Sequence, residues 1–207
     1  MPPAMPRTRQ SSRLFLAGLL ALSLSLPTAA AAHPEEIVPG RCRRGTLPDG
    51  ALSLICIPTS GWNGDLVIFA HGYVAFNEPL DAYESQLTLS DGTYLPELVQ
   101  SLGFAFATTS YRRNGLAILE GMADIRQLIE AFPHRAHGHT PAHTYLTGAS
   151  EGGIITALLA ERHPELFTGA LSACGPIGNF RQQLNYWGDF RVLFDYFFPG
   201  LLPPSPI

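Results

Sequence analysis

The chain has 207 residues, of which 46% are hydrophobic and 14% charged, and its formal net charge is -4. This composition excludes a disordered or repeat protein and predicts one globular domain with a hydrophobic core. Nucleic-acid binding needs a basic surface, and the acidic balance of this chain offers none. We therefore expect no nucleic-acid partner.

The first 32 residues have the three parts of a secretory signal peptide. Arg7, Arg9 and Arg13 precede the apolar run 14–26, and an alanine tract ends at Ala32. The apolar run, at about 13 residues, is too short for a membrane-spanning helix. We predict cleavage after Ala32, no stable membrane anchor afterwards, and a secreted or periplasmic protein.

Two of the three cysteines are placed for a disulfide, which an exported protein can keep. Cys42 and Cys56 lie at equal distances on either side of the turn signal Pro-Asp-Gly at 48–50. A hairpin centred on this turn would place them opposite each other. We predict that they are bonded, with two unpaired thiols as the alternative. Cys174 lies in an apolar stretch and is expected to be a small buried residue rather than a nucleophile.

Strand and helix patterns alternate along the rest of the chain. Unbroken apolar runs are typical of strands in parallel sheets that helices cover on both faces. The expected strands are 51–57, which is the second arm of the hairpin, 66–70, 104–108, 143–147 and 169–173. The expected helices are 95–102, 118–132 before Pro133, and 151–163 before Pro164. This order predicts an α/β fold with a doubly wound, mostly parallel sheet after an N-terminal β-hairpin.

Residues 148–152, Gly-Ala-Ser-Glu-Gly, carry the pattern GxSxG between an expected strand and an expected helix. In such a nucleophile elbow, a strained turn lifts a serine hydroxyl away from the backbone. Gly148 and Gly152 would be needed where neighbouring backbone passes too close for side chains. The alternative is a glycine-rich turn with a bystander serine. Because the flanking strand and helix favour the elbow, Ser150 is the candidate nucleophile.

From about 66 to 178 the chain resembles the α/β-hydrolase family, in its serine esterase, lipase or prolyl oligopeptidase branches. The elbow and the pair His71-Gly72 carry this resemblance, each at the end of an expected strand. The resemblance implies that Ser150 is the nucleophile of a hydrolase. A polar loop at 76–93, which follows the His-Gly pair, is long enough to be functional.

The same resemblance assigns the residues around the nucleophile. The backbone N–H groups of Glu151 and Tyr73 would stabilise the oxyanion that acyl transfer creates. Gly72 would let the backbone approach the substrate. The side chain of His71 is expected to order its loop, with a general-base role as the alternative.

The acid and the base of the family do not follow Ser150 as they should. In this fold an Asp or Glu and then a His come after the nucleophile, but the only histidine after Ser150 is His163, which we expect on the surface. Asp189 and Asp195 are not followed by a histidine, and a serine without a base is a poor nucleophile. We therefore expect the chain to be the N-terminal part of a longer enzyme, lacking the C-terminal strands, rather than a natural minimal enzyme.

The expected organisation has three parts. Residues 1–32 form the signal peptide, 33–178 the N-terminal part of the hydrolase domain, and 179–207 the start of a lid or a truncated tail. The last part is rich in Phe, Tyr and Trp, and an apolar segment of this kind normally packs against something.

Two further clusters of polar residues are candidate sites. Four histidines lie between positions 134 and 143, but their spacing matches no zinc pattern, so we expect no metal site. Arg112 and Arg113 follow the carboxyl end of a strand, where open α/β sheets bind ligands. They would contact an anionic substrate group or have a structural role.

Together these patterns predict a secreted carboxylic-ester hydrolase that forms an acyl-enzyme on Ser150 and needs no cofactor. The substrate would be a small-molecule or polymeric ester, and the abundance of Phe and Tyr suggests an apolar or aromatic group on it. The alternatives are a serine peptidase of the prolyl oligopeptidase type and a non-catalytic remnant that at most binds ligands. The missing histidine favours the non-catalytic remnant for the 207 residues of this chain taken alone.

Overall fold

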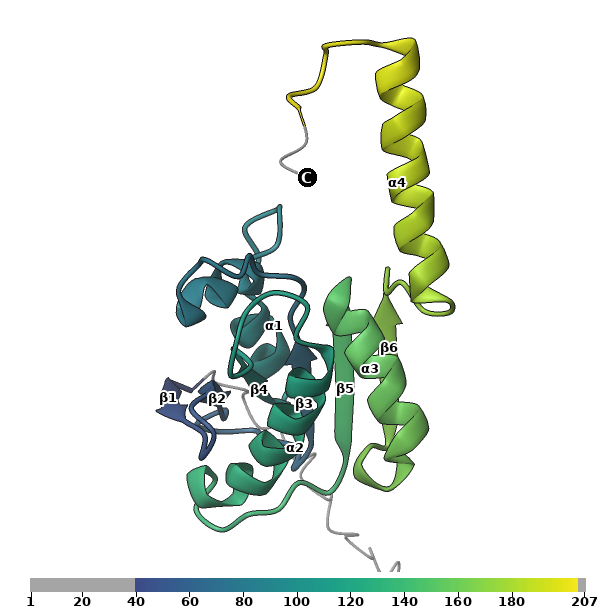
Figure 1. Ribbon diagram of the computed structural model, residues 1–207. Coiled ribbons are helices and arrows are strands. Elements are labelled where there is room, and N and C mark those ends of the chain that lie inside the picture. The colour runs from purple at the N-terminus through teal and green to yellow at the C-terminus, as the bar shows by residue number, and fades with distance from the viewer. Residues whose placement is uncertain (1–39, 205–207) are drawn as a thin grey trace, which may run out of the picture. The chain divides into compact units, whose positions relative to one another are not determined.

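The computed structural model describes residues 40–204, so the expected signal peptide lies outside the described residues. Within them, one sheet has the strand order β1-β2-β4-β3-β5-β6 (Figure 1). The strands are β1 (Cys42–Thr46), β2 (Leu52–Cys56), β3 (Leu66–Ala70), β4 (Ala105–Thr109), β5 (Thr144–Ala149) and β6 (Gly169–Ala173). β2 runs antiparallel to β1 and to β4, and the other neighbours are parallel. The expected α/β fold with an N-terminal hairpin and a mostly parallel sheet is confirmed.

The hairpin closes at the predicted turn and carries the predicted disulfide. Gly50 has a φ of 94°, a left-handed conformation that glycine adopts without steric cost. Cys42 lies directly opposite Cys56 in the register of β1 and β2, and their sulfur atoms are bonded. The disulfide links the edge strand of the sheet to its neighbour.

Helices cover both faces of the sheet. The helical elements of the described chain are η1 (Leu80–Leu87), α1 (Leu95–Ser101), α2 (Ile118–Arg135), α3 (Glu151–Arg162), η2 (Pro164–Leu166) and α4 (Phe180–Phe197). α4 has no buried residue and does not cover the sheet. α2 and α3 pack on one face, and α1 lies on the other (Figure 1). The helices and strands that the sequence predicts agree with these bounds within two residues, except at the end of α2.

The strands are apolar without alternation because both faces are covered. Successive strand residues point to opposite faces. Ala107 of β4 is therefore buried in the same cluster as Ile125 of α2 and Ile155 of α3. The preceding residue, Phe106, is buried on the other face with Tyr83 of η1.

The prediction that Pro133 ends the second helix is wrong. α2 continues to Arg135 and contains Pro133 in its last turn. A proline lacks the N–H that would bond four residues back, and its ring crowds the C=O group there. Only two residues of α2 follow Pro133, so little helix lies beyond this disturbance. The helix ends where His137 and Gly138 both turn left-handed, with φ of 53° and 86°.

The prediction that Cys174 is buried is also wrong. Cys174 is exposed and directly follows β6. β6 pairs only with β5 in the described sheet, so its outer side has no strand to cover it. An apolar sequence does not bury a residue that has no neighbours on one side.

None of the helices between residues 40 and 204 combines the length and the hydropathy needed to cross a membrane.

Candidate active site

The two motifs meet at the carboxyl ends of adjacent strands. β3 and β5 are parallel neighbours, with Ala70 opposite Gly148 at the ends from which the loop 71–73 and Ser150 continue. The chain passes from β3 to β4 on one side, and then to β5 on the other side of β3. Open α/β sheets bind ligands at such a reversal of strand order. The fold therefore places the two motifs where a ligand site is expected.

Ser150 occupies a strained turn between β5 and α3. Its φ is 55° and its ψ is -118°, and such a conformation costs a residue other than glycine about 1–3 kcal/mol. The N–H of Ser150 donates to the C=O of Ala173 at 3.0 Å, and its C=O accepts from the N–H of Gly153 at 2.9 Å. Hydrogen bonds on both sides thus hold the turn in this conformation.

The glycines of the elbow are required by close backbone contacts. A side chain on Gly152 would collide with the C=O groups of Ala70 and His71, and one on Gly148 would collide with the backbone of Gly152. A Cβ atom on Gly72 would lie 3.4 Å from the Cβ atom of Ser150. The loop after β3 therefore lies directly against the elbow.

Two backbone N–H groups beside Ser150 donate no hydrogen bond to any described residue. They belong to Tyr73 and Glu151, whereas the N–H groups of Gly72 and Ser150 are both bonded. The N–H of Glu151 also lies at the N-terminal, positive end of α3. Unbonded N–H groups next to a nucleophile are what stabilisation of an oxyanion requires.

The side chain of Glu151 has a separate role that the sequence did not indicate. It is buried, and its Oε1 atom accepts a hydrogen bond of 2.6 Å from the N–H of Ala117, the residue before α2. Burial raises the pKa of the Glu151 carboxyl. The carboxylate thus ties the elbow to the start of α2.

His71 is buried within its own loop. Its ring stacks on Tyr111 with 4.0 Å between centroids, its Nδ1 lies 2.7 Å from the C=O of Gly72, and Nε2 has no partner among the described residues. The hydroxyl of Tyr111 donates to the C=O of His71 at 3.0 Å. Burial lowers the pKa of His71 to about 4, so the ring is neutral at neutral pH. These contacts suit a residue that orders the loop.

The other described histidines lie away from Ser150. His134, His137 and His139 lie at the end of α2 and in the connection that leads to the start of β5, the opposite end of that strand from Ser150. His163 follows the end of α3 and pairs with Glu165 at 3.3 Å, about 18 Å along the helix from the elbow at 1.5 Å per residue. His143 precedes β5, at the opposite end of that strand from Ser150, and pairs with Asp65 at 2.9 Å. Residues 40–204 hold no group of three or more side chains suited to a metal ion.

The two arginines after β4 are held in ion pairs. Arg112 contacts both Asp124 and Asp49, and its N–H donates to Asp124 at 2.6 Å, while Arg113 pairs with Glu120 at 3.0 Å. Burial and the neighbouring Asp49 raise the pKa of Asp124 to about 6, against the opposing effect of Arg112. These contacts favour a structural role for the two arginines over contact with an anionic substrate group.

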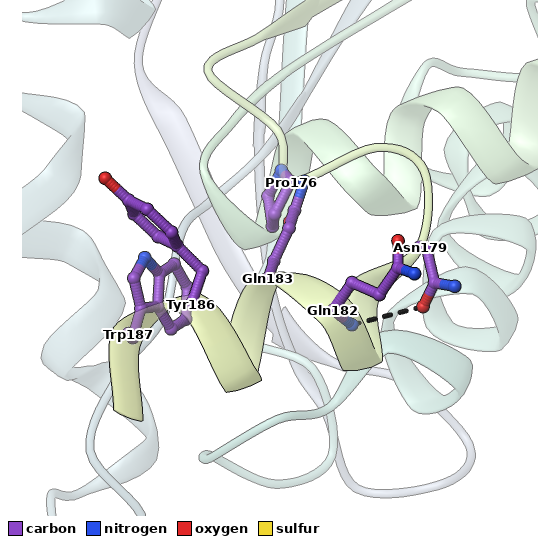
Figure 2. A pocket seen from close by; sticks show the side chains of 6 residues that line it. All are labelled: Pro176, Asn179, Gln182, Gln183, Tyr186 and Trp187. Atoms are coloured by element: carbon purple, nitrogen blue, oxygen red, sulfur yellow. Dashed lines mark hydrogen bonds between the residues drawn. The ribbon is translucent and has the colours of Figure 1, made fainter. Parts of the chain in front are cut away.

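A shallow hollow of about 520 Å³ lies at the start of α4 (Figure 2). It is lined by the side chains of Pro176, Asn179, Gln182, Gln183, Tyr186 and Trp187. Tyr186 and Trp187 are consecutive residues of α4, and Asn179 caps the helix by accepting from the N–H of Gln182 at 3.1 Å (Figure 2). This segment follows β6, whose last residue bonds to Ser150.

No protein-family model and no curated protein matches the chain, whereas several solved structures share its fold. The chain is similar to the Pyrococcus furiosus esterase Pf2001, with 14% identity, a TM-score of 0.51, and coverage of 78% of this chain and 58% of that one. It is similar to an esterase B from Lactobacillus rhamnosis, with 19% identity, a TM-score of 0.51, and coverage of 78% and 57%.

A looser likeness, with 20% identity and a TM-score of 0.48, is to a Pyrococcus horikoshii acylaminoacyl peptidase, where the match covers 66% of this chain and 23% of that one. The chain therefore spans a little over half the length of the two esterases and about a quarter of the peptidase.

Proposed function

We propose that this chain, which has the α/β-hydrolase fold, belongs to a secreted serine hydrolase that cleaves carboxylic esters. The observation that carries this proposal is the strained turn at Ser150, with the unbonded N–H groups of Tyr73 and Glu151 on the two segments that meet there. The fold of the two esterases supports it, and the disulfide between Cys42 and Cys56 is compatible with export.

In the proposed reaction, the Oγ atom of Ser150 attacks the carbonyl carbon of the ester. The carbonyl electrons move to oxygen, and the resulting oxyanion accepts hydrogen bonds from Tyr73 and Glu151. Loss of one such donor typically lowers kcat by about 100- to 1000-fold. Collapse of the intermediate releases the alcohol, and water then hydrolyses the acyl-enzyme on Ser150 to the free acid.

The proton of the Ser150 hydroxyl needs a base, and none of the described histidines is placed to accept it. His71 is buried in its loop, and His163 lies at the far end of α3. We propose that the acid and the base are supplied from outside residues 40–204. Water is the second acceptor of the acyl group, after Ser150. The protein contributes only side-chain and backbone groups to the proposed chemistry.

The test is labelling with a fluorophosphonate, which reacts with activated serines, followed by mass spectrometry to locate the adduct. We expect Ser150 to be labelled in the enzyme encoded by the full gene and the label to be lost in Ser150→Ala. Ser101→Ala, which changes an exposed serine on α1, is the matched control and should be labelled at the normal rate. Labelling that persists in Ser150→Ala would exclude this nucleophile.

The bond that is cleaved is tested separately. We expect p-nitrophenyl esters to be hydrolysed and the corresponding peptidyl p-nitroanilides to be left intact. Faster cleavage of the anilides would replace the esterase assignment with a peptidase, while leaving the role of Ser150 in place.

A further inference from the structure

Gln86 contacts the loop that carries the proposed oxyanion donor Tyr73. Its Oε1 atom accepts a hydrogen bond of 2.7 Å from the N–H of Gly72. Its Nε2 atom donates to the C=O of Tyr73 at 3.1 Å and lies 3.4 Å from the C=O of Gly72. One carboxamide therefore holds both sides of this short stretch of backbone.

These contacts restrict the plane of the peptide between Gly72 and Tyr73. In a trans peptide, the C=O of one residue and the N–H of the next point in opposite directions. The C=O of Gly72 lies near Nδ1 of His71, at 2.7 Å, and near Nε2 of Gln86. The N–H of Tyr73 is therefore directed to the other side, away from both side chains.

Without such contacts this peptide would be free to rotate. Gly72 lacks a Cβ atom, so the backbone on either side of it has an unusually wide choice of conformations. A larger residue at 72 would approach the C=O of Ala149 to 3.3 Å. A side chain at position 72 would be crowded, and the glycine found there leaves the restraint of the backbone to contacts such as those of Gln86.

Gln86 is itself anchored to the core. It belongs to η1, whose residues Tyr83 and Leu87 are fully buried against Phe106 of β4. The ring of Tyr83 also lies 5.3 Å from the ring of His71. The carboxamide is thus anchored to the same sheet from which the loop continues after β3.

We propose that Gln86 is a positioning residue that fixes the Gly72–Tyr73 peptide, so that the N–H of Tyr73 is directed at the oxyanion. This inference rests on the proposed function. The carboxamide of Gln86 offers an acceptor to Gly72 and a donor to Tyr73 at once, whereas a carboxylate in its place would lack the donor and an aliphatic side chain would lack both.

The test compares variants at two glutamines that bond to backbone in the same way. Gln86→Leu removes both hydrogen bonds, and Gln86→Glu keeps the acceptor and removes the donor. Gln100→Leu is the matched control, because Gln100 accepts from the N–H of Gly40 at 2.7 Å and donates to the C=O of Pro96 at 3.0 Å, on α1. All three variants are to be made in the full-length enzyme and compared by melting temperature.

We expect both Gln86 variants to slow fluorophosphonate labelling of Ser150 by about 10- to 100-fold. Ester kcat should fall by a similar factor, with KM changed less than about twofold, because an oxyanion donor acts in the transition state. Gln100→Leu should lower the melting temperature and leave the labelling rate within about twofold of the wild type. Wild-type labelling and kcat in Gln86→Leu would overturn the proposal.

Amide hydrogen exchange separates this inference from the proposed function. The N–H of Gly72 should exchange slowly in the wild type and faster in Gln86→Leu, with no change at Gly72 in Gln100→Leu. Slow exchange that persists in Gln86→Leu would show that Gln86 does not restrain the loop. A wild-type enzyme that takes no label would instead overturn the proposed function, and with it the catalytic part of this inference.

Discussion

Helices α3 and α4 both carry many apolar residues, but only α3 is buried. The first six residues of α3, Glu151–Thr156, are all buried, whereas none of the 18 residues of α4 is. Trp187 and Phe190 of α4 are 54% and 59% exposed in the described chain. Apolar content alone therefore does not decide which helix joins the core.

The difference lies in what each helix can approach. The first turn of α3 contains Gly152 and Gly153, and a Cβ atom on either would collide with the backbone of a neighbouring segment. α4 also contains a glycine, Gly188, but a Cβ atom there would meet nothing within 4 Å. Small residues let α3 pack tightly on the strands, whereas no described strand or helix packs closely on α4, whose side chains bond only within the helix and to the segments that flank it.

The largest expected effect is that of Gly152→Ala. The added methyl group would overlap the C=O of Ala70, and backbone at this position cannot move without breaking the contact between β3 and the elbow. We expect a loss of more than about 4 kcal/mol in the free energy of unfolding, seen as loss of soluble folded protein. A normal yield and melting temperature of Gly152→Ala would show that α3 packs less closely on β3 than the structure indicates.

The next effect is that of Leu159→Ala, which removes a fully buried side chain of α3. We expect a loss of about 2–5 kcal/mol in urea unfolding, because the change leaves a cavity. Leu193→Ala on α4 is the matched control, since Leu193 is 57% exposed, and its effect should stay within about 0.5 kcal/mol. Equal losses at the two positions would mean that α4 is buried in solution.

The smallest effect is expected from Gly188→Ala. Alanine favours an open helix interior over glycine by about 0.5–1 kcal/mol. The variant should therefore gain helical circular dichroism signal and lose no stability in urea unfolding. A loss of stability in Gly188→Ala would show that another segment packs against α4 at Gly188.

Local signals were enough for most of the fold. The turn at 48–50 and the equal spacing of Cys42 and Cys56 predicted the hairpin and its disulfide, because a two-stranded pairing depends on a short segment. Unbroken apolar runs predicted the buried strands, because each run lies within a single short segment of the chain. The predicted end of α2 at Pro133 was wrong because a proline in the last turn has little helix after it to disturb.

The side chains that support the candidate site could not be found in this way. Gln86 contacts Gly72 from another element, and Glu151 bonds to Ala117, which lies 34 residues earlier in the chain. Neither contact leaves a pattern in the sequence around it. The long loop at 76–93 was the one indirect signal for Gln86.

For this protein, periodicity, turn residues and the GxSxG pattern sufficed to identify the strands, the helices α1, α2 and α3, and the candidate nucleophile Ser150, because each depends on residues close in the chain. They did not predict η1 or α4. Tertiary structure alone decided that α4 is exposed, that Arg112 is paired with Asp124, and that Gln86 holds the Tyr73 loop. These outcomes depend on which distant segments meet, since burial and hydrogen bonding are properties of neighbours in space.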